Sequence, residues 1–270
     1  MLDCAEGVQV GLRKMRLNIS NIQAIFLTHM HGDHVFGLIG LLSTLGLLGR
    51  QQQLHIYGPA PLQSIFQPQI DYFCADSPFE IMLHEIDSQV PQIVYEDRSV
   101  TISTIPLSHR VKCCGYMLKE KQTSPHIKRD MIDYFNIPIS QINNIKAGAD
   151  WTLDDGTVVP NCRLTTPAAP ARSYAYCTDT KYKPDIAELI PNANCLYHEA
   201  TFSQEHMLLA KKTFHSTAEQ AAHIAQAAHV SQLVIGHFSS RYNDENLLLE
   251  EAKTVFPNTI LANEGMKIKL

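Results

Sequence analysis

Short strand-like runs alternate with helical patterns along most of the chain. The run "IQAIFLTH" (22–29) predicts a buried strand, and "HVFGLIGLLSTLGLLG" (34–49) predicts a mostly apolar helix that ends at Gly49. A second strand at 54–58 precedes a helix with proline near its start. This alternation favours an α/β layered fold over an all-α or an all-β one.

The same pattern continues toward the C-terminus. Apolar runs at 79–86 and 99–109 predict two more strands. Between the later runs, 216–230 predicts a helix in which Ser216 and Glu219 have the spacing of a capping box. Three further strands each end at a polar residue that can bind a metal: 173–180, 194–201 and 231–239.

One polar segment, 121–150, interrupts the strand pattern. It predicts an excursion from the domain, and "WTLDDGTVV" after it predicts a hairpin with Asp155 and Gly156 at the turn. No repeat or long linker divides the sequence. We therefore expect a single domain, 1–270, that carries 121–150 as an inserted arm.

Composition narrows the range of partners. The chain has 270 residues, is 45% hydrophobic and has a net charge of -5, so it can bury a large core but has no overall basic field. Any nucleic acid must therefore be held by a local basic patch. The seven cysteines are odd in number and contain no CxxC pair, which favours reduced thiols and a cytoplasmic protein. No signal peptide or membrane-spanning run is evident, so we expect no membrane association.

The loop after the first predicted strand concentrates metal-binding chemistry. "THMHGDH" contains His29, His31, Asp33 and His34, with Gly32 allowing a tight turn. Residues two apart can point the same way, so His29 and His31 can hold one ion while Asp33 and His34 face a second. Imidazole and carboxylate ligands together suit zinc or manganese.

A site for two metals needs further ligands from elsewhere in the chain. His109, Asp179 and His237 each follow a predicted strand, at the same kind of strand-to-loop junction as His29. Such junctions gather at one edge of an α/β sheet, where sites are usually built. Asp179 suits a bridging position because a carboxylate can offer one oxygen to each ion.

These residues resemble the metal ligands of the metallo-β-lactamase superfamily. Within it, the chain resembles the ribonuclease Z family of tRNA 3′-end endonucleases over nearly its whole length. The segments that carry the likeness are "LDCAEGVQ" (2–9), "HVFGLIGLLSTLGLLGR" (34–50), "YHEATF" (197–202), "HSTAEQAA" (215–222), "HFSSRY" (237–242) and "FPNTILANEGM" (256–266).

The resemblance implies two Zn²⁺ ions per subunit, with Mn²⁺ as the alternative. One ion would be held by His29, His31 and His109, the other by Asp33, His34 and His237, and Asp179 would bridge them. Asp33 would also orient the attacking water or take its proton.

The resemblance also implies an acid for the leaving 3′-oxygen. That acid would be His215, oriented by Glu199, whereas we expect His198 to have a structural role. Basic side chains near these positions are candidates for binding RNA phosphates. They are Arg241, Lys211 and Lys212, with Arg110 and Lys112 as further members of a basic rim.

The implied fold is a four-layer αββα sandwich. The family's usual opening strands would precede "LDCAEG", so we expect an N-terminally truncated form. The family's protruding arm, which grips tRNA, corresponds to 121–150; here it keeps Ile137-Pro138 and Gly148 but lacks the usual Gly-Pro pair. The resemblance further implies a homodimer in which one subunit's arm holds the tRNA that the other cleaves.

The implied activity is removal of the 3′ trailer from precursor tRNA, just after the discriminator base. Two alternatives differ in class. One is a dinuclear hydrolase of small phosphodiesters or esters, similar to an arylsulfatase or lactonase. The other is a non-catalytic RNA-binding protein that keeps the ligands without turnover. The presence of Asp33 and His215 favours an enzyme.

Overall fold

The N-terminal part of the chain is built on a sheet of three parallel strands, in a computed structural model that describes residues 1–270. The buried leucines of helix α3 recur at spacings of three and four and share one hydrophobic core with Ile25, Leu27 and Ile56 of the sheet region. The elements of this part are β1 (Ala24–Phe26), β2 (Leu54–Pro59), β3 (Ile81–Ile86), α1 (Val8–Lys14), η1 (Ile19–Asn21), α2 (Gly32–Val35), α3 (Leu38–Leu47) and α4 (Leu62–Phe73).

The apolar segment 34–49 takes part in two helices, α2 and α3, instead of forming the single helix that the sequence predicts. The break lies at Gly37, whose N–H donates to the carbonyl oxygen of Cys4 at 2.9 Å. A Cβ added at Gly37 would overlap the carbonyl oxygen of Ala5. The chain therefore bends where the N-terminal segment approaches its backbone, which the local sequence pattern does not reveal.

Seven strands form the second sheet, in the order β14-β13-β12-β11-β6-β5-β4. Strands β11 to β14 pair in parallel, and β4 and β5 pair antiparallel. The strands are β4 (Ile93–Glu96), β5 (Val100–Pro106), β6 (Cys114–Glu120), β11 (Ser173–Cys177), β12 (Cys195–Glu199), β13 (Gln232–Gly236) and β14 (Thr259–Leu261).

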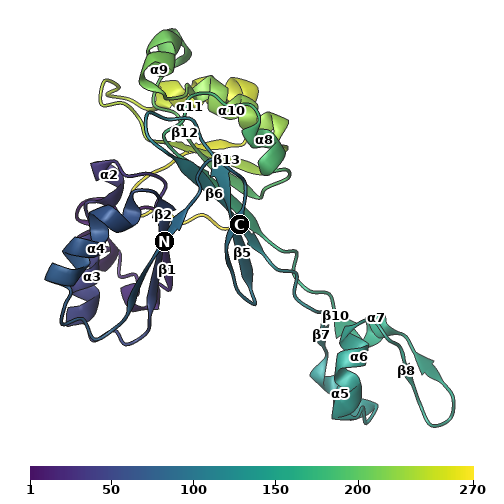
Figure 1. Cartoon of the computed structure of the whole chain (residues 1–270). Helices are drawn as coiled ribbons and strands as arrows, with labels where there is room; N and C mark the ends of the chain where they lie inside the picture. The colour runs from purple at the N-terminus through teal and green to yellow at the C-terminus, as the bar shows by residue number, and fades with distance from the viewer. The chain divides into compact units, whose positions relative to one another are not determined.

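Helices cover one face of this second sheet (Figure 1). Leu196 and Leu233 from the strands pack in one core with Ile186, Ala222 and Leu248 from the helices. The elements beside the sheet are α8 (Ile186–Leu189), η3 (Gln204–His206), α9 (Met207–Thr213), α10 (Ala218–Ala227) and α11 (Asn246–Val255).

The two sheets pack against each other through β1 and β6. The hydroxyl of the fully buried Tyr116 donates to the carbonyl oxygen of Leu27 at 2.7 Å, and the ring centroids of Phe26 and Tyr116 lie 5.4 Å apart. The N–H of Cys114 donates to the carbonyl oxygen of Thr28 at 3.1 Å. This packing gives the order helix, sheet, sheet, helix, which confirms the predicted αββα fold.

The chain divides into two compact units, and the second consists of 97–100 and 119–172. It has its own small core of Ile137, Ile145 and Leu164. The polar segment 121–150 lies wholly inside this unit. Its elements are β7 (His126–Ile127), α5 (Arg129–Tyr134), η2 (Ile139–Gln141), α6 (Ile142–Lys146), β8 (Trp151–Thr152), β9 (Val158–Val159), α7 (Asn161–Leu164) and β10 (Thr165–Thr166).

Two local predictions can be compared with the structure. The predicted hairpin forms, because β8 and β9 pair antiparallel and Gly156 at its turn has φ 84. The capping box of α10 is formed by Thr217 and Gln220, so the prediction of Ser216 and Glu219 was wrong by one residue. Both pairs have the required spacing, but the hydroxyl of Ser216 donates to the carbonyl oxygen of Thr180 instead.

The structure describes the state of the cysteines and the character of the helices. All seven cysteines are free, and all are buried or partly buried except Cys162, which is exposed on α7. No helix combines the length and the apolar character that crossing a bilayer requires.

Candidate active site

The loop after β1 delivers the first group of polar side chains. His29 is wholly buried, the backbone is extended at His31, and α2 begins at the next residue. This change of backbone places Asp33 and His34 on the first turn of α2. The loop therefore presents its four candidate ligands in two pairs, as the spacing predicts.

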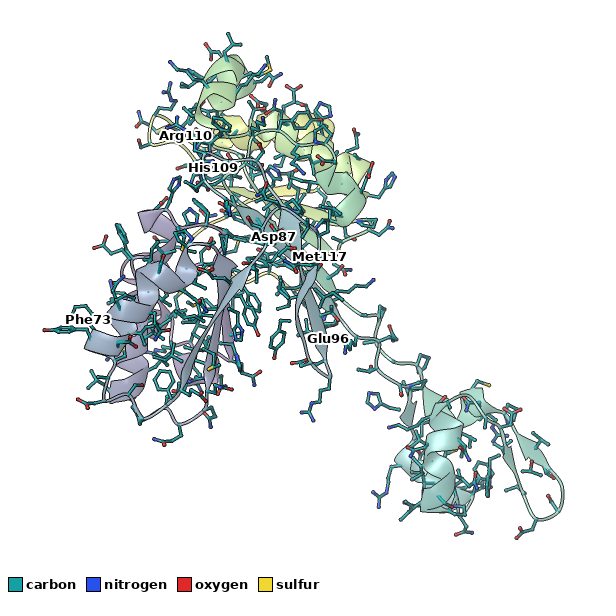
Figure 2. The ribbon with its side chains drawn as sticks, in the orientation of Figure 1. Phe73, Asp87, Glu96, His109, Arg110 and Met117 are labelled. Atoms are coloured by element: carbon teal, nitrogen blue, oxygen red, sulfur yellow. The ribbon has the colours of Figure 1, made fainter.

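One cluster joins this loop to two distant strand ends. Nε2 of His29 lies 3.0 Å from Nδ1 of His31, and Nε2 of His109 lies 3.3 Å from the same atom. His109 and its neighbour Arg110 come from the loop between β5 and β6 (Figure 2). Ligand atoms of these three histidines and of Asp179 all lie within 4.8 Å of one another.

A second cluster consists of Asp33, His34 and His237. Nε2 of His34 lies 3.5 Å from Oδ2 of Asp33, and His237 follows the end of β13. The same geometric limit also groups His215 with Asp179 and His237. Every predicted metal ligand thus lies in one connected set of side chains.

Asp179 lies between the two clusters and directs one oxygen to each. Its Oδ2 is 3.6 Å from Nε2 of His29 and 3.8 Å from Nε2 of His109. Its Oδ1 is 3.6 Å from Nε2 of His34 and 3.2 Å from Nε2 of His237. One carboxylate can therefore contact two cations.

Two of these residues occupy strained backbone positions. Asp179 has φ 41 and His237 has φ 60, in the left-handed region that residues other than glycine seldom adopt. Each follows the end of a parallel strand of the second sheet. Strain of this kind persists only where the surroundings impose it, and it is concentrated at functional sites.

The outward-facing nitrogens of the histidines are occupied by hydrogen bonds. The Nδ1–H groups of His29, His109 and His237 donate to Thr28 Oγ1 at 3.0 Å, to the carbonyl oxygen of Phe214 at 3.1 Å and to Thr201 Oγ1 at 2.9 Å. Each bond fixes the tautomer in which Nε2 carries a lone pair toward the cluster. The donor set therefore fits divalent metal ions that favour imidazole and carboxylate.

Asp3 also supports the candidate ligands through hydrogen bonds, and no role for it was predicted from the sequence. Its Oδ2 accepts a hydrogen bond from Nδ1 of His34 at 2.8 Å, and its Oδ1 accepts one from the N–H of Thr28 at 2.8 Å. The hydroxyl of Tyr176 donates to Oδ2 at 3.3 Å. Asp3 lies in the segment 2–9, whose likeness to the family was the only available signal.

A buried carboxylate holds His215 beside the clusters. Oε1 of Glu199, which is wholly buried, lies 2.8 Å from Nδ1 of His215. The N–H groups of Thr180 and Ser216 also donate to Glu199. His198, next to Glu199, is wholly buried and its Nδ1–H donates to the carbonyl oxygen of Glu199 at 2.7 Å.

Thr201 links the two parts of the site and was also missed from the sequence. Its hydroxyl donates to Oε2 of Glu199 at 2.6 Å while it accepts the hydrogen bond from His237. Ser216, the residue mistaken for a helix cap, donates from its hydroxyl to the carbonyl oxygen of Thr180 at 2.6 Å. Short polar side chains of this kind are too common in sequences to mark a site.

Burial and charge fix the protonation of the cluster. Burial, with the neighbouring imidazole of His34 as the next cause, lowers the pKa of His29 to about 2, so this imidazole stays neutral. Burial opposes ionisation of Asp179, but the imidazoles of His237, His34 and His29 beside it outweigh burial and hold the pKa of this carboxyl at about 2. For His215, burial opposes protonation, yet the hydrogen bond and charge of Glu199 raise its pKa above the ordinary value.

The predicted basic residues differ in how they relate to the site. Lys211 lines a cavity together with His215. The guanidinium carbon of Arg241 lies 5.5 Å from the ring centroid of Phe202. Lys212 is exposed on the last turn of α9 and does not line that cavity.

Comparisons with known proteins agree with this geometry. Residues 1–127 and 123–238 match the family model of the β-lactamase superfamily domain. The ribonuclease Z of Bacteroides thetaiotaomicron is 52% identical over 270 residues, which is 100% of this chain and 85% of that protein. The ribonuclease Z of Porphyromonas gingivalis is 46% identical over 270 residues, covering 100% of this chain and 89% of that protein.

Solved structures give the same result. Human tRNase Z, short form, superposes with a TM-score of 0.68 and 25% identity, covering 99% of this chain and 86% of that one. The metallo-β-lactamase fold protein YhfI from Bacillus subtilis, at 20% identity and a TM-score of 0.65, shares the fold. Because the ribonuclease Z relatives align with the whole chain, the protein belongs to the ribonuclease Z family of hydrolases in the metallo-β-lactamase superfamily, which confirms the resemblance found in its sequence.

Proposed function

We propose that this chain is a metal-dependent endoribonuclease that removes the 3′ trailer from precursor tRNA with two Zn²⁺ ions. The observation that carries the proposal is the position of Asp179, whose two oxygens face two separate histidine clusters, with His215 beside both. Membership of the ribonuclease Z family supports tRNA as the substrate.

In this proposal, His29, His31 and His109 hold one ion, Asp33, His34 and His237 hold the other, and Asp179 contacts both. When bound, such ions act as Lewis acids that lower the pKa of water and neutralise charge on a phosphate. Mn²⁺ is the alternative ion for the same ligands.

The protein's own groups then move the protons. The oxygen of a water molecule forms a bond to phosphorus while the bond from phosphorus to the 3′-oxygen of the discriminator nucleotide breaks. Asp33, whose side chain is 68% exposed, orients the water and accepts its proton. His215 gives a proton to the departing 3′-oxygen, and Glu199 keeps His215 oriented and protonated. The products are a tRNA with a 3′-hydroxyl and a trailer with a 5′-phosphate.

Basic side chains and the second unit would bind the rest of the substrate. Lys211, Lys212 and Arg241 are near enough in the chain to His215 and His237 to hold phosphates on either side of the scissile bond. The segment 121–150 is proposed to contact the tRNA body, supported by the separate core of its unit. We further propose a homodimer, and a cytoplasmic location where seven free cysteines stay reduced.

A cleavage assay tests this function directly. The zinc-loaded chain is incubated with precursor tRNA that carries a labelled 3′ trailer, and in parallel with a small chromogenic phosphodiester. We expect one cut, after the discriminator nucleotide. Turnover of the small diester alone would instead indicate a general phosphodiesterase, and tRNA binding without any turnover would indicate a non-catalytic RNA-binding protein.

Replacement of Asp33, the proposed general base, distinguishes a loss of catalysis from a loss of tRNA binding. Asp33→Ala should lower kcat by about 10²–10⁴-fold and leave most tRNA affinity, because a positioned base contributes about that factor. Asp76→Ala, which alters an exposed carboxylate outside both clusters, is the matched control and should cleave normally. Undiminished cleavage by the Asp33 variant would refute the proposed mechanism.

A further inference from the structure

A cavity of about 400 Å³ opens beside His215, and the reaction as described makes no use of its apolar side chains. Its walls come from α9, from the loop that follows Asp179, and from His215 and Gln220. Apolar surface is contributed by Tyr182, Met207 and Leu208. These side chains are 37%, 41% and 79% exposed, which is unusual for large apolar groups next to a reaction centre.

The same cavity is positively charged. Lys181 and Lys211 line it, and no carboxylate does. The ammonium of Lys181 lies 5.6 Å from the ring centroid of Phe214, within the range of a cation–π contact. This contrasts with the neighbouring clusters, which contain Asp33 and Asp179. The cavity therefore suits an anion with an apolar, planar part.

A nucleotide has this combination of properties. An aromatic side chain such as Tyr182 can stack on any base, and lysines hold the phosphates on either side of it. The volume lies within the roughly 300–1,000 Å³ typical of small-ligand pockets. A single nucleotide of an RNA strand would therefore fill the space between α9 and the loop of Tyr182.

The position of His215 indicates which nucleotide of the substrate would occupy the cavity. Its Nδ1 is bound to Glu199, while its ring also lines the cavity. The proton of His215 goes to the 3′-oxygen that leaves, and that oxygen is on the ribose of the nucleotide preceding the cut. A base on this same ribose lies within one nucleotide length of His215, whose ring lines the cavity.

We propose that this cavity is the binding pocket for the discriminator base, the last base of the mature tRNA, with Tyr182 as its stacking surface and Lys181 and Lys211 as its phosphate contacts. This inference rests on the proposed function. It makes the pocket a determinant of where the strand is positioned for cleavage, in addition to the metal ligands. It also assigns roles to Tyr182, Met207 and Leu208, which the reaction itself does not require.

A double-mutant cycle between protein and substrate tests the pocket. The wild-type chain and Tyr182→Ala are each assayed on precursor tRNA with a normal discriminator nucleotide and with an abasic one. Loss of the stack should lower kcat/KM about tenfold on the normal substrate. On the abasic substrate the same substitution should have less than a twofold effect, because the partner of Tyr182 is already absent.

Two controls sharpen the assignment. Tyr182→Phe keeps an aromatic surface and should restore most of the activity. Tyr72→Ala removes a tyrosine of α4 that is 80% exposed and does not line the cavity, and it should change neither substrate's cleavage. A precursor whose abasic site is the first trailer nucleotide should remain fully sensitive to Tyr182→Ala.

Each outcome is decisive. Equal losses from Tyr182→Ala on normal and abasic discriminator substrates would overturn the pocket assignment while leaving the proposed function intact. Coupling of Tyr182 to the first trailer nucleotide would overturn it too, because the base would then lie on the other side of the cut. Failure of the wild-type chain to cut any precursor would overturn the proposed function and this inference together.

Discussion

Nδ1 of His34 lies 2.8 Å from Oδ2 of Asp3, a residue 31 positions earlier in the chain. The carboxylate fixes the tautomer in which Nε2 of His34 faces the second cluster without a proton. Asp3 itself has φ 50 and is only 8% exposed, so its position is imposed by its surroundings. Orienting contacts of this kind support the ligands of metal sites.

Asp3→Asn should therefore lower the affinity for Zn²⁺ by about 10–100-fold, although no direct ligand is changed. The amide of Asn would turn an N–H toward Nδ1 of His34, and a proton shifted to Nε2 would block that ligand atom. Competition with a chromogenic chelator measures the affinity. Glu6→Gln, which alters an exposed acid in the same segment, should bind zinc like the wild type; equal affinity in the Asp3 variant would contradict the role given to Asp3.

Glu199→Gln should shift the alkaline limb of the pH–rate profile to lower pH. In the proposed mechanism His215 acts as an acid only while protonated, so activity should fall as pH rises through its pKa. The hydrogen bond and charge of Glu199 raise that pKa, and their removal lowers it. The profile of kcat for tRNA cleavage measures the shift. In a His215→Ala background, Glu199→Gln should have little further effect, and an unchanged limb in the single variant would contradict the pairing.

The parts of the site that could be predicted from sequence are those with local spacing. His29, His31, Asp33 and His34 lie within six positions, and the remaining ligands follow apolar runs that predict strands. Asp3 and Thr201 could not be assigned a role, because only tertiary packing brings them against His34 and His237. Their residue types carry no local signal.

The same limit explains the errors in the fold. Helix 34–49 is broken because the backbone of Ala5 approaches Gly37, a contact between segments that periodicity does not encode. The predicted cap of α10 was wrong by one residue because Ser216-Glu219 and Thr217-Gln220 have equal spacing. The hydrogen bond from Ser216 to the carbonyl oxygen of Thr180 occupies the hydroxyl of Ser216, so Thr217 forms the cap instead. Tertiary packing thus sets where a helix breaks and which residue caps it, while the hydrophobic pattern of the sequence sets whether a segment forms a helix or a strand.

Two glycine substitutions should change stability in opposite directions. Gly37→Ala should lower the free energy of unfolding by about 1–3 kcal/mol, because the new Cβ overlaps the carbonyl oxygen of Ala5. Gly11→Ala lies inside α1, meets no atom closer than 4.0 Å and should raise it by about 0.5–1 kcal/mol. Thermal unfolding of both variants beside the wild type gives the signs. A stabilised Gly37 variant would contradict this prediction and show that the backbone at Ala5 can shift to make room for the added Cβ.

Removal of metal should abolish cleavage and lower the melting temperature, and added Zn²⁺ should restore both. A ligand that binds only the folded state stabilises it by about 2.7 kcal/mol at 100 times its Kd. Metal analysis after dialysis should give two ions per chain for the wild type. His31→Ala and His237→Ala should each retain one ion, because they alter different clusters, whereas Asp179→Ala should weaken both sites. One ion per wild-type chain, lost entirely in both His31→Ala and His237→Ala, would replace the two-ion proposal with a single site.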